Sequence, residues 1–253
     1  MGFSRSFSAR KSEEPCRFGI PVLDESLGGG LARGAIILIE DEVGVNSAPF
    51  LIQFLSEGLQ SGEYAYILGT EHMYDYYRQL LIPFGIEEIV VEMKRLVYLD
   101  AFTTPFGGKD IGGVRSDANT VKDLLQPRHV TDVINQATLH VRGENVRGVF
   151  DSLTTVLMIS DDLKAPLSLF HNKIANDKKA GNVTAFTVHR DVHDPKVVHL
   201  LEHYADAVFR ITREQRADDP APTDYMEVVK GSLTGVKKFR YRGMPGKIEL
   251  EPI

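Results

Sequence analysis

The chain has few of the features that mark secreted and membrane proteins. It contains a single cysteine, Cys16, among 253 residues, so an internal disulfide cannot form. That composition fits a reducing compartment. Its apolar runs all fall short of the roughly 18 residues that a membrane-spanning helix requires. The first 15 residues have no hydrophobic segment of the kind that a secretory signal contains. We therefore expect a cytoplasmic protein.

An excess of positive charge is also missing. The formal net charge is −6 and the pI is about 5.8, which removes the simplest argument for a nucleic-acid partner. The fractions of hydrophobic residues (43%) and charged residues (25%) are ordinary for a soluble protein. We find no repeat and no interior linker. We therefore expect residues 1–15 to form a polar, disordered tail and residues 16–253 to form one domain.

Apolar strand-like segments alternate with helix-like segments along most of the chain. Strands are expected at residues 35–40, 64–70, 95–102, 146–153, 182–189 and 206–211, and helices at 48–62, 73–85, 127–141, 168–181 and 194–205. This alternation predicts an α/β fold with a mainly parallel sheet and right-handed crossovers. The last three segments, 223–232, 235–243 and 246–253, alternate like antiparallel strands added at the sheet edge.

Several motifs occur in a characteristic order. They are "GIPVLDESLGGGLARG" (residues 19–34), "AIILIE" (35–40), "LIQFLSEGLQSGE" (51–63), "VFDSLT" (149–154) and "LEHYADAVFRI" (201–211). In this order they resemble the KaiC-like branch of the RecA-like ATPases, over about residues 17–253. The resemblance implies a RecA-like P-loop NTPase fold, in which helices flank the sheet.

The segment where this family carries its phosphate-binding loop is heavily substituted. The pattern is G-x-x-x-x-G-K-[ST]. Its two glycine positions hold Asp41 and Asn46, its lysine position Ser47 and its Ser/Thr position Ala48, while Gly44 remains. The glycines let backbone N–H groups wrap an anion, the lysine supplies positive charge and the hydroxyl holds magnesium. Ser47 is expected to cap the helix that follows.

Three consecutive acidic residues, Glu40, Asp41 and Glu42, stand at the start of this loop. Two like charges 4 Å apart repel by about 4 kcal/mol at an effective dielectric constant of 20. We therefore expect the segment to disfavour a triphosphate. The alternatives for the triplet itself are a solvated turn, a cation site or a contact for a basic partner.

The resemblance assigns roles to four further positions. Asp151 stands where the family has the Walker B aspartate that steers magnesium; alternatively, it caps the following turn. Glu71 matches one of two acidic residues that polarise the attacking water, and His72 stands at the other; alternatively, Glu71 is a solvated loop residue. The family also reaches across a subunit boundary with a basic segment, in which this chain keeps Lys230 but has Ser232 in place of arginine.

Two histidine patterns leave other possibilities open. "HLLEH" (residues 199–203) matches a zinc-protease pattern with two histidines one helical turn apart, although the segment is also an ordinary core helix in the family. His72, His189 and His193 would line the carboxyl edge of the sheet, where open α/β sheets bind ligands. A surface or core role is the alternative for these three.

Lys238, Arg240 and Arg242 alternate along an expected strand, so they would form a basic stripe on one face, with Phe239 and Tyr241 on the other. The stripe predicts either a solvated or protein-facing edge, or a contact with a polyanion such as nucleic acid.

From these features we expect a non-catalytic pseudo-ATPase that has a regulatory or scaffolding role, as in signalling. ATP hydrolysis and a bound cofactor are not expected, and Asp151 is a weak candidate for binding a metal. The expected partner is a protein, or a second copy bound through the RecA-like interface. One alternative is a weak ATPase that uses ATP and magnesium with Glu71 and Asp151. Another is a DNA-repair accessory that resembles recombinase paralogues.

Overall fold

The computed structural model describes residues 14–86, 94–103, 119–141, 143–215 and 221–253. Most of the expected N-terminal tail therefore lies outside the described residues, and so does most of the Gly-rich loop at 103–120. Glu14 and Pro15 are exposed. In the ranges that are described, no helix is both long and apolar enough to span a bilayer.

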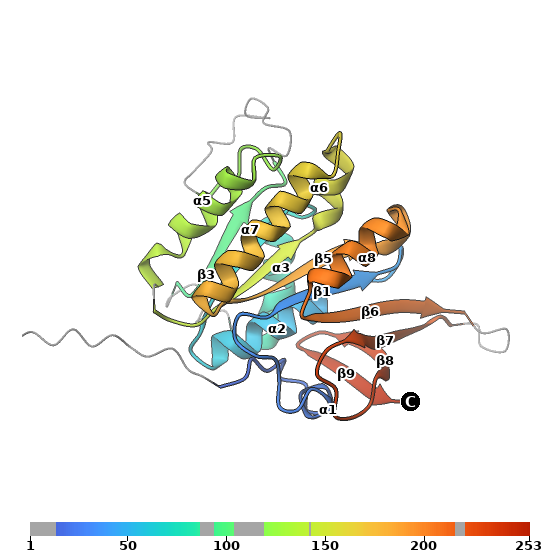
Figure 1. Cartoon of the computed structure of the whole chain (residues 1–253). Helices are drawn as coiled ribbons and strands as arrows, with labels where there is room; N and C mark the ends of the chain where they lie inside the picture. Colours follow the sequence, from blue (N-terminus) through green and yellow to red (C-terminus); the bar gives the residue numbers. More distant parts are fainter. Residues whose placement is uncertain (1–13, 87–93, 104–118, 142, 216–220) are drawn as a thin grey trace, which may run out of the picture.

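Within the described ranges, nine strands form one sheet, and their order across it is β3-β2-β4-β5-β1-β6-β7-β8-β9 (Figure 1). The parallel part consists of β3 (Leu96–Asp100), β2 (Tyr64–Gly69), β4 (Val146–Asp151), β5 (Val183–His189), β1 (Ile36–Asp41) and β6 (Ala207–Glu214). The antiparallel edge consists of β7 (Thr223–Lys230), β8 (Lys238–Met244) and β9 (Lys247–Pro252). The predicted mixed sheet is confirmed.

Helices cover both faces of the sheet (Figure 1). The short α1 (Pro21–Ser26), α2 (Ala48–Gln60) and α3 (Tyr74–Leu81) pack on one face, together with side chains of the curled C-terminal strands. The other face carries α5 (Pro127–Ala137), α6 (Leu153–Ile159), α7 (Lys164–Ala180) and α8 (Pro195–Tyr204). In the described residues, the 3₁₀ turns η1 (Ile82–Phe84), η3 (Leu139–Val141) and η4 (Arg190–Val192) follow α3, α5 and β5.

The alternation of side chains along β1 sets the position of the acidic residues. All six residues of β1 are buried; Ile37 and Ile39 join the core beneath α2, whereas Ile36 and Leu38 join the core beneath α7 and α8. Because successive strand residues point to opposite faces, Glu40 continues the second row and Asp41 the first. The two carboxylates are therefore on opposite sides of the sheet.

Some element ends differ from those expected. The helix expected at 127–141 ends at Ala137 and is followed by η3, while the helix expected from residue 168 already begins at Lys164. Strand β1 also runs one residue further than expected. Asp41 belongs to it because it is in register with His189 on β5 and with Ile211 on β6.

Candidate functional site at the end of β1

The acidic triplet is not a solvated turn. Glu40 is 0% exposed and Asp41 is 2% exposed. Glu40 Oε2 accepts a hydrogen bond from Arg210 Nε at 2.8 Å, because Glu40 and Arg210 are in register on neighbouring strands. Glu42 Oε2 accepts from the backbone N–H of Arg213 at 3.0 Å. The turn expectation was wrong because it took no account of partners that neighbouring strands supply.

Asp41 lies at the centre of a polar cluster at the end of β1. Ser47 Oγ donates to Asp41 Oδ2 at 2.6 Å, and His189 Nδ1 contacts Asp41 Oδ1. The second ring nitrogen, His189 Nε2, is 3.0 Å from Glu71 Oε2. The hydrogen bond to Asp41, followed by the one to Glu71, raises the pKa of His189 from 6.5 to about 10. His189 therefore carries a positive charge at neutral pH and bridges two carboxylates.

Glu71 is likewise not a solvated loop residue. Its side chain is 22% exposed and contacts His189. Burial raises the pKa of Glu71, but the hydrogen bond and charge of His189 outweigh burial, so the net shift is downward. The sequence offered one signal for this pair: His189 ends one expected strand and Glu71 follows another, and the carboxyl ends of parallel strands meet at one edge of the sheet.

The start of α2 is capped differently from the expectation. The hydroxyl of Ser47 points back to Asp41 and makes no cap hydrogen bond. The side-chain oxygen of Asn46 instead accepts from the N–H of Ala48 at 3.0 Å. The Ser47 prediction failed because its hydroxyl donates to the buried carboxylate of Asp41 and accepts no hydrogen bond from the backbone N–H groups of α2.

The remaining donors in the first turn of α2 are also occupied or absent. Pro49 has no N–H. The N–H groups of Phe50 and Leu51 both donate to the carbonyl oxygen of Ser47, at 3.0 Å and 3.2 Å. Gly44, which has φ of +93°, keeps the left-handed conformation that favours glycine in this loop.

Asp151, at the end of β4, does not cap the following turn. Its two carboxylate oxygens accept from the hydroxyls of Tyr77, at 2.9 Å, and Thr187, at 2.7 Å. Ser152 caps α6 instead, by accepting from the N–H of Thr154 at 3.0 Å. Burial raises the pKa of Asp151. No local sequence pattern predicted Tyr77 or Thr187 as partners of Asp151, because both lie far from it in the chain.

Of the three histidines expected at this edge, His189 alone bridges carboxylates among the contacts of the described residues. The ring of His72 packs against that of Tyr76 in a tilted arrangement, with ring centroids 3.9 Å apart. His193 Nε2 is 3.2 Å from the hydroxyl of Thr154. Burial, together with the nearby charge of His189, lowers the pKa of His193. The histidine rim therefore comprises three separate environments.

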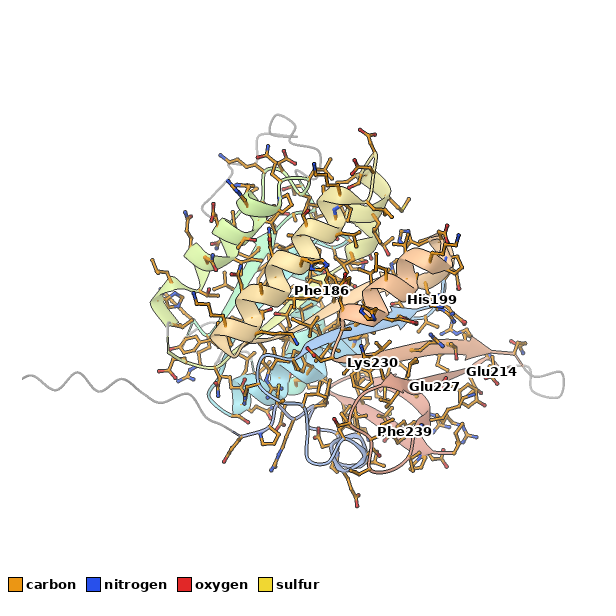
Figure 2. The ribbon with its side chains drawn as sticks, in the orientation of Figure 1. Phe186, His199, Glu214, Glu227, Lys230 and Phe239 are labelled. Atoms are coloured by element: carbon orange, nitrogen blue, oxygen red, sulfur yellow. The ribbon has the colours of Figure 1, made fainter. Side chains whose placement is uncertain are left out.

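Lys230 binds the end of a helix in its own chain. Its Nζ donates to the carbonyl oxygens of Glu202 and His203, at 3.0 Å and 2.9 Å, and so caps the C-terminus of α8. Figure 2 shows Lys230 on β7 beside this helix, with His199 further along it. Within the described ranges no three His, Cys, Asp or Glu side chains are placed to hold a metal ion. The zinc-site alternative for "HLLEH" therefore has no third ligand there.

The basic residues of β8 share one face, as expected, because they alternate with the buried Phe239 and Tyr241. Each also has a carboxylate close by. Lys238 Nζ is 3.3 Å from Glu214, Arg240 contacts Glu251 at 2.8 Å and Arg242 is in register with Glu249. Each basic residue of the stripe therefore has an acidic residue beside it, which offsets part of its positive charge.

Comparison with known proteins agrees with the fold. The KaiC ATPase family model matches residues 16–243. UPF0273 protein PF1931 of Pyrococcus furiosus is 32% identical over 139 residues, which cover 54% of each chain, and UPF0273 protein PH0284 of Pyrococcus horikoshii is 31% identical over the same shares. The chain thus spans about half the length of these curated relatives in the matched region.

Two solved structures from Pyrococcus horikoshii share the fold at low identity. The KaiC-like protein PH0186 has a TM-score of 0.72 at 16% identity, covering 95% of this chain and 100% of that one. The uncharacterized protein PH0321, solved in complex with an unknown peptide, has a TM-score of 0.70 at 18% identity, covering 93% and 98%. With a family model that covers most of its length and neighbours of the same fold, the chain belongs to the KaiC-like branch of the RecA-like ATPases.

Proposed function

We propose that this protein is a non-catalytic member of its family, with a regulatory or scaffolding role. The observation that carries the proposal is the cluster of Ser47, Asp41, His189 and Glu71, in which side chains of the chain itself satisfy one another where a phosphate-binding loop would need free donors. The family membership alone is neutral on this point.

The residues do not fit a triphosphate with magnesium. An anion at a helix N-terminus needs free backbone N–H groups that point at it, and those of Ala48 and Phe50 are already bonded within the chain, while Pro49 has none. The charge of His189 is shared between two carboxylates. Both oxygens of Asp151 accept hydrogen bonds from hydroxyls. We therefore propose that no nucleotide cofactor is used.

The proposed partner is a protein, or a second copy of the chain, in a cytoplasmic signalling assembly. Support for a protein partner comes from PH0321, a structural neighbour that was solved with a peptide. That likeness concerns the fold, so it supports a class of partner and no particular binding surface.

Calorimetric titration with ATP and Mg²⁺ tests the proposal. We expect neither heat of binding nor a thermal shift at millimolar nucleotide. A KaiC-like protein with an intact G-x-x-x-x-G-K-[ST] loop, measured in the same buffer, serves as the positive control. Magnesium-dependent binding at micromolar nucleotide would overturn the proposal and favour the second candidate, a weak ATPase, which the surviving carboxylates of Asp151 and Glu71 support.

The third candidate, a DNA-repair accessory, rests on the basic residues of β8. It requires single-stranded DNA binding that weakens steeply with salt. Reversing the charge of Lys238 and Arg240 would abolish such binding, whereas reversing Lys122, an exposed residue before α5, would leave it unchanged. Because carboxylates neighbour the β8 cations, we expect DNA binding to be absent in wild type at 150 mM salt.

A further inference from the structure

Glu40 is a fully buried carboxylate in which one of the two oxygens has no hydrogen-bond partner among the described residues. It is 0% exposed in the central strand β1. One oxygen, Oε2, accepts from Arg210 Nε at 2.8 Å. The other, Oε1, has no hydrogen-bond partner in the described part of the chain. A buried acceptor without a partner is costly, and a buried charged one more so.

Arg210 is shared with a second carboxylate. Its Nη2 donates to Glu202 Oε1 at 2.9 Å, which links strand β6 to helix α8 on the same side of the sheet as Glu40. The neighbours of Glu40 on β5 and β6 are Val188, which is uncharged, and Arg210. One guanidinium therefore serves two carboxylates.

Two other charged side chains lie at the edge of this cluster. Glu227 on β7 is in register with Arg210 and adds a third negative charge around it. Figure 2 labels Glu227 and Lys230 on that strand. The ammonium group of Lys230 donates to the carbonyl oxygens of Glu202 and His203 at the end of α8, and among the contacts of the described residues it donates to neither the Glu40 nor the Glu202 carboxylate. The cluster is therefore short of positive charge.

A proton relieves this imbalance. Burial, followed by the neighbouring carboxylate of Glu202, raises the pKa of Glu40 from 4.5 to about 7, although Arg210 opposes the shift. A pKa near 7 makes the protonation of Glu40 sensitive to small changes of pH around neutrality.

We propose that Glu40, Arg210 and Glu202 form a proton-dependent latch that sets how firmly α8 is held against β1. When Glu40 is protonated and neutral, the positive charge of Arg210 is balanced by Glu202 alone. The ion pair between β6 and α8 is then electrically neutral. Without the proton, two carboxylates compete for Arg210 and one buried oxygen stays unsatisfied, so α8 is held less firmly. The latch lies in the strand that carries Asp41, but it is independent of whether a nucleotide binds.

Amide hydrogen exchange of α8 tests the latch in the full chain. After correction for the intrinsic dependence of exchange on pH, we expect the protection of residues 198–204 to fall by about tenfold between pH 6 and pH 8.5, as a carboxyl group with this shift requires. In Glu40→Gln, a neutral and nearly isosteric variant, protection should stay the same at both pH values. The exposed variant Glu214→Gln is the matched control and should behave as wild type.

A direct titration keeps the proposal testable if Glu40→Gln does not fold. The ¹³C resonance of the Glu40 carboxyl in wild type should titrate with a midpoint near neutrality, and Glu202→Gln should lower that midpoint. A midpoint below pH 5 would overturn the latch. So would equal pH dependence of α8 exchange in wild type and in Glu40→Gln.

Discussion

His189 contacts two carboxylates at once, one at the end of β1 and one in the loop after β2. The environment of His189 differs from that of the nearby His193, which contacts a hydroxyl and has a lowered pKa. Removing one partner of a buried ion pair leaves the other charge uncompensated, which costs far more than the pair contributes when intact.

We expect His189→Gln to lower the free energy of unfolding by about 2 kcal/mol at pH 7, somewhat less than the roughly 3–5 kcal/mol typical of fully buried pairs, since the side chain is 30% exposed. Urea denaturation measures the change. His193→Gln is the control and should change stability by less than about 0.5 kcal/mol. An equal effect of the two variants would contradict the role given to His189.

Glu63 is a second residue whose charge is held by burial and pairing. It accepts from Arg33 at 2.8 Å and from Arg147 at 3.0 Å, and these two guanidinium groups lower its pKa to about 2 against the effect of burial. We expect Glu63→Gln to cost about 3 kcal/mol at pH 7. Chemical denaturation would show it. The exposed Glu249→Gln, whose partner is Lys247, should cost almost nothing.

At the scale of elements, α8 has a defined cap at each end. Asp194 accepts from the N–H of Lys196 at its start, and Lys230 binds the last carbonyl oxygens at its end. A cation at a helix C-terminus satisfies unpaired carbonyl groups and complements the helix dipole. The tertiary contact thus replaces the glycine cap that the local sequence lacks.

We expect Lys230→Met to lower the free energy of unfolding by about 1 kcal/mol and to speed amide exchange in the last turn of α8. Lys237→Met, a change at an exposed lysine just before β8, is the matched control. If Lys230 acted across a subunit boundary, its loss would instead change the oligomeric state and leave exchange of α8 in the monomer unaltered.

Most elements were predictable because apolar periodicity is a local property. The apolar run from Ala35 to Ile39 before the substituted loop predicted β1, and the C-terminal alternation predicted β7, β8 and β9. The ends were less predictable. Asp41 reads as a turn residue, yet pairing with β5 and β6 extends the strand through it. Asn46 caps α2 in place of Ser47, because the hydroxyl of Ser47 donates to the buried carboxylate of Asp41.

For the whole molecule, the shifted pKa values of Glu63, Glu40 and His189 predict a dependence of stability on pH. Glu63 stabilises the fold above pH 4.5, and this contribution is lost as pH falls toward 2. The pKa of Glu40 is raised, so its contribution is present below pH 4.5 and is lost as pH rises through 7. The pKa of His189 is raised as well, so its contribution is full below pH 6.5 and is lost as pH rises through about 10.

We therefore expect the free energy of unfolding to be highest near pH 5 and to decline steadily from there to pH 9. Urea denaturation at pH 5, 7 and 9 measures the trend. Glu40→Gln should flatten the part between pH 5 and 7, while His189→Gln should flatten the part above pH 7. Stability that rises from pH 5 to 9 would show that these two groups do not dominate.

The amino-acid sequence by itself determined the α/β architecture, the family resemblance and the substituted positions of the phosphate-binding loop. Each of these depends on local patterns of apolar residues, glycines and charges. Only the tertiary structure decided what the charges do. Glu40, Asp41 and Glu71 read as solvent-exposed acids, but the sheet brings Arg210 and His189 to them from about 170 and 118–148 residues away. Charge pairing depends on distances of a few ångströms in space, which separation along the chain does not encode.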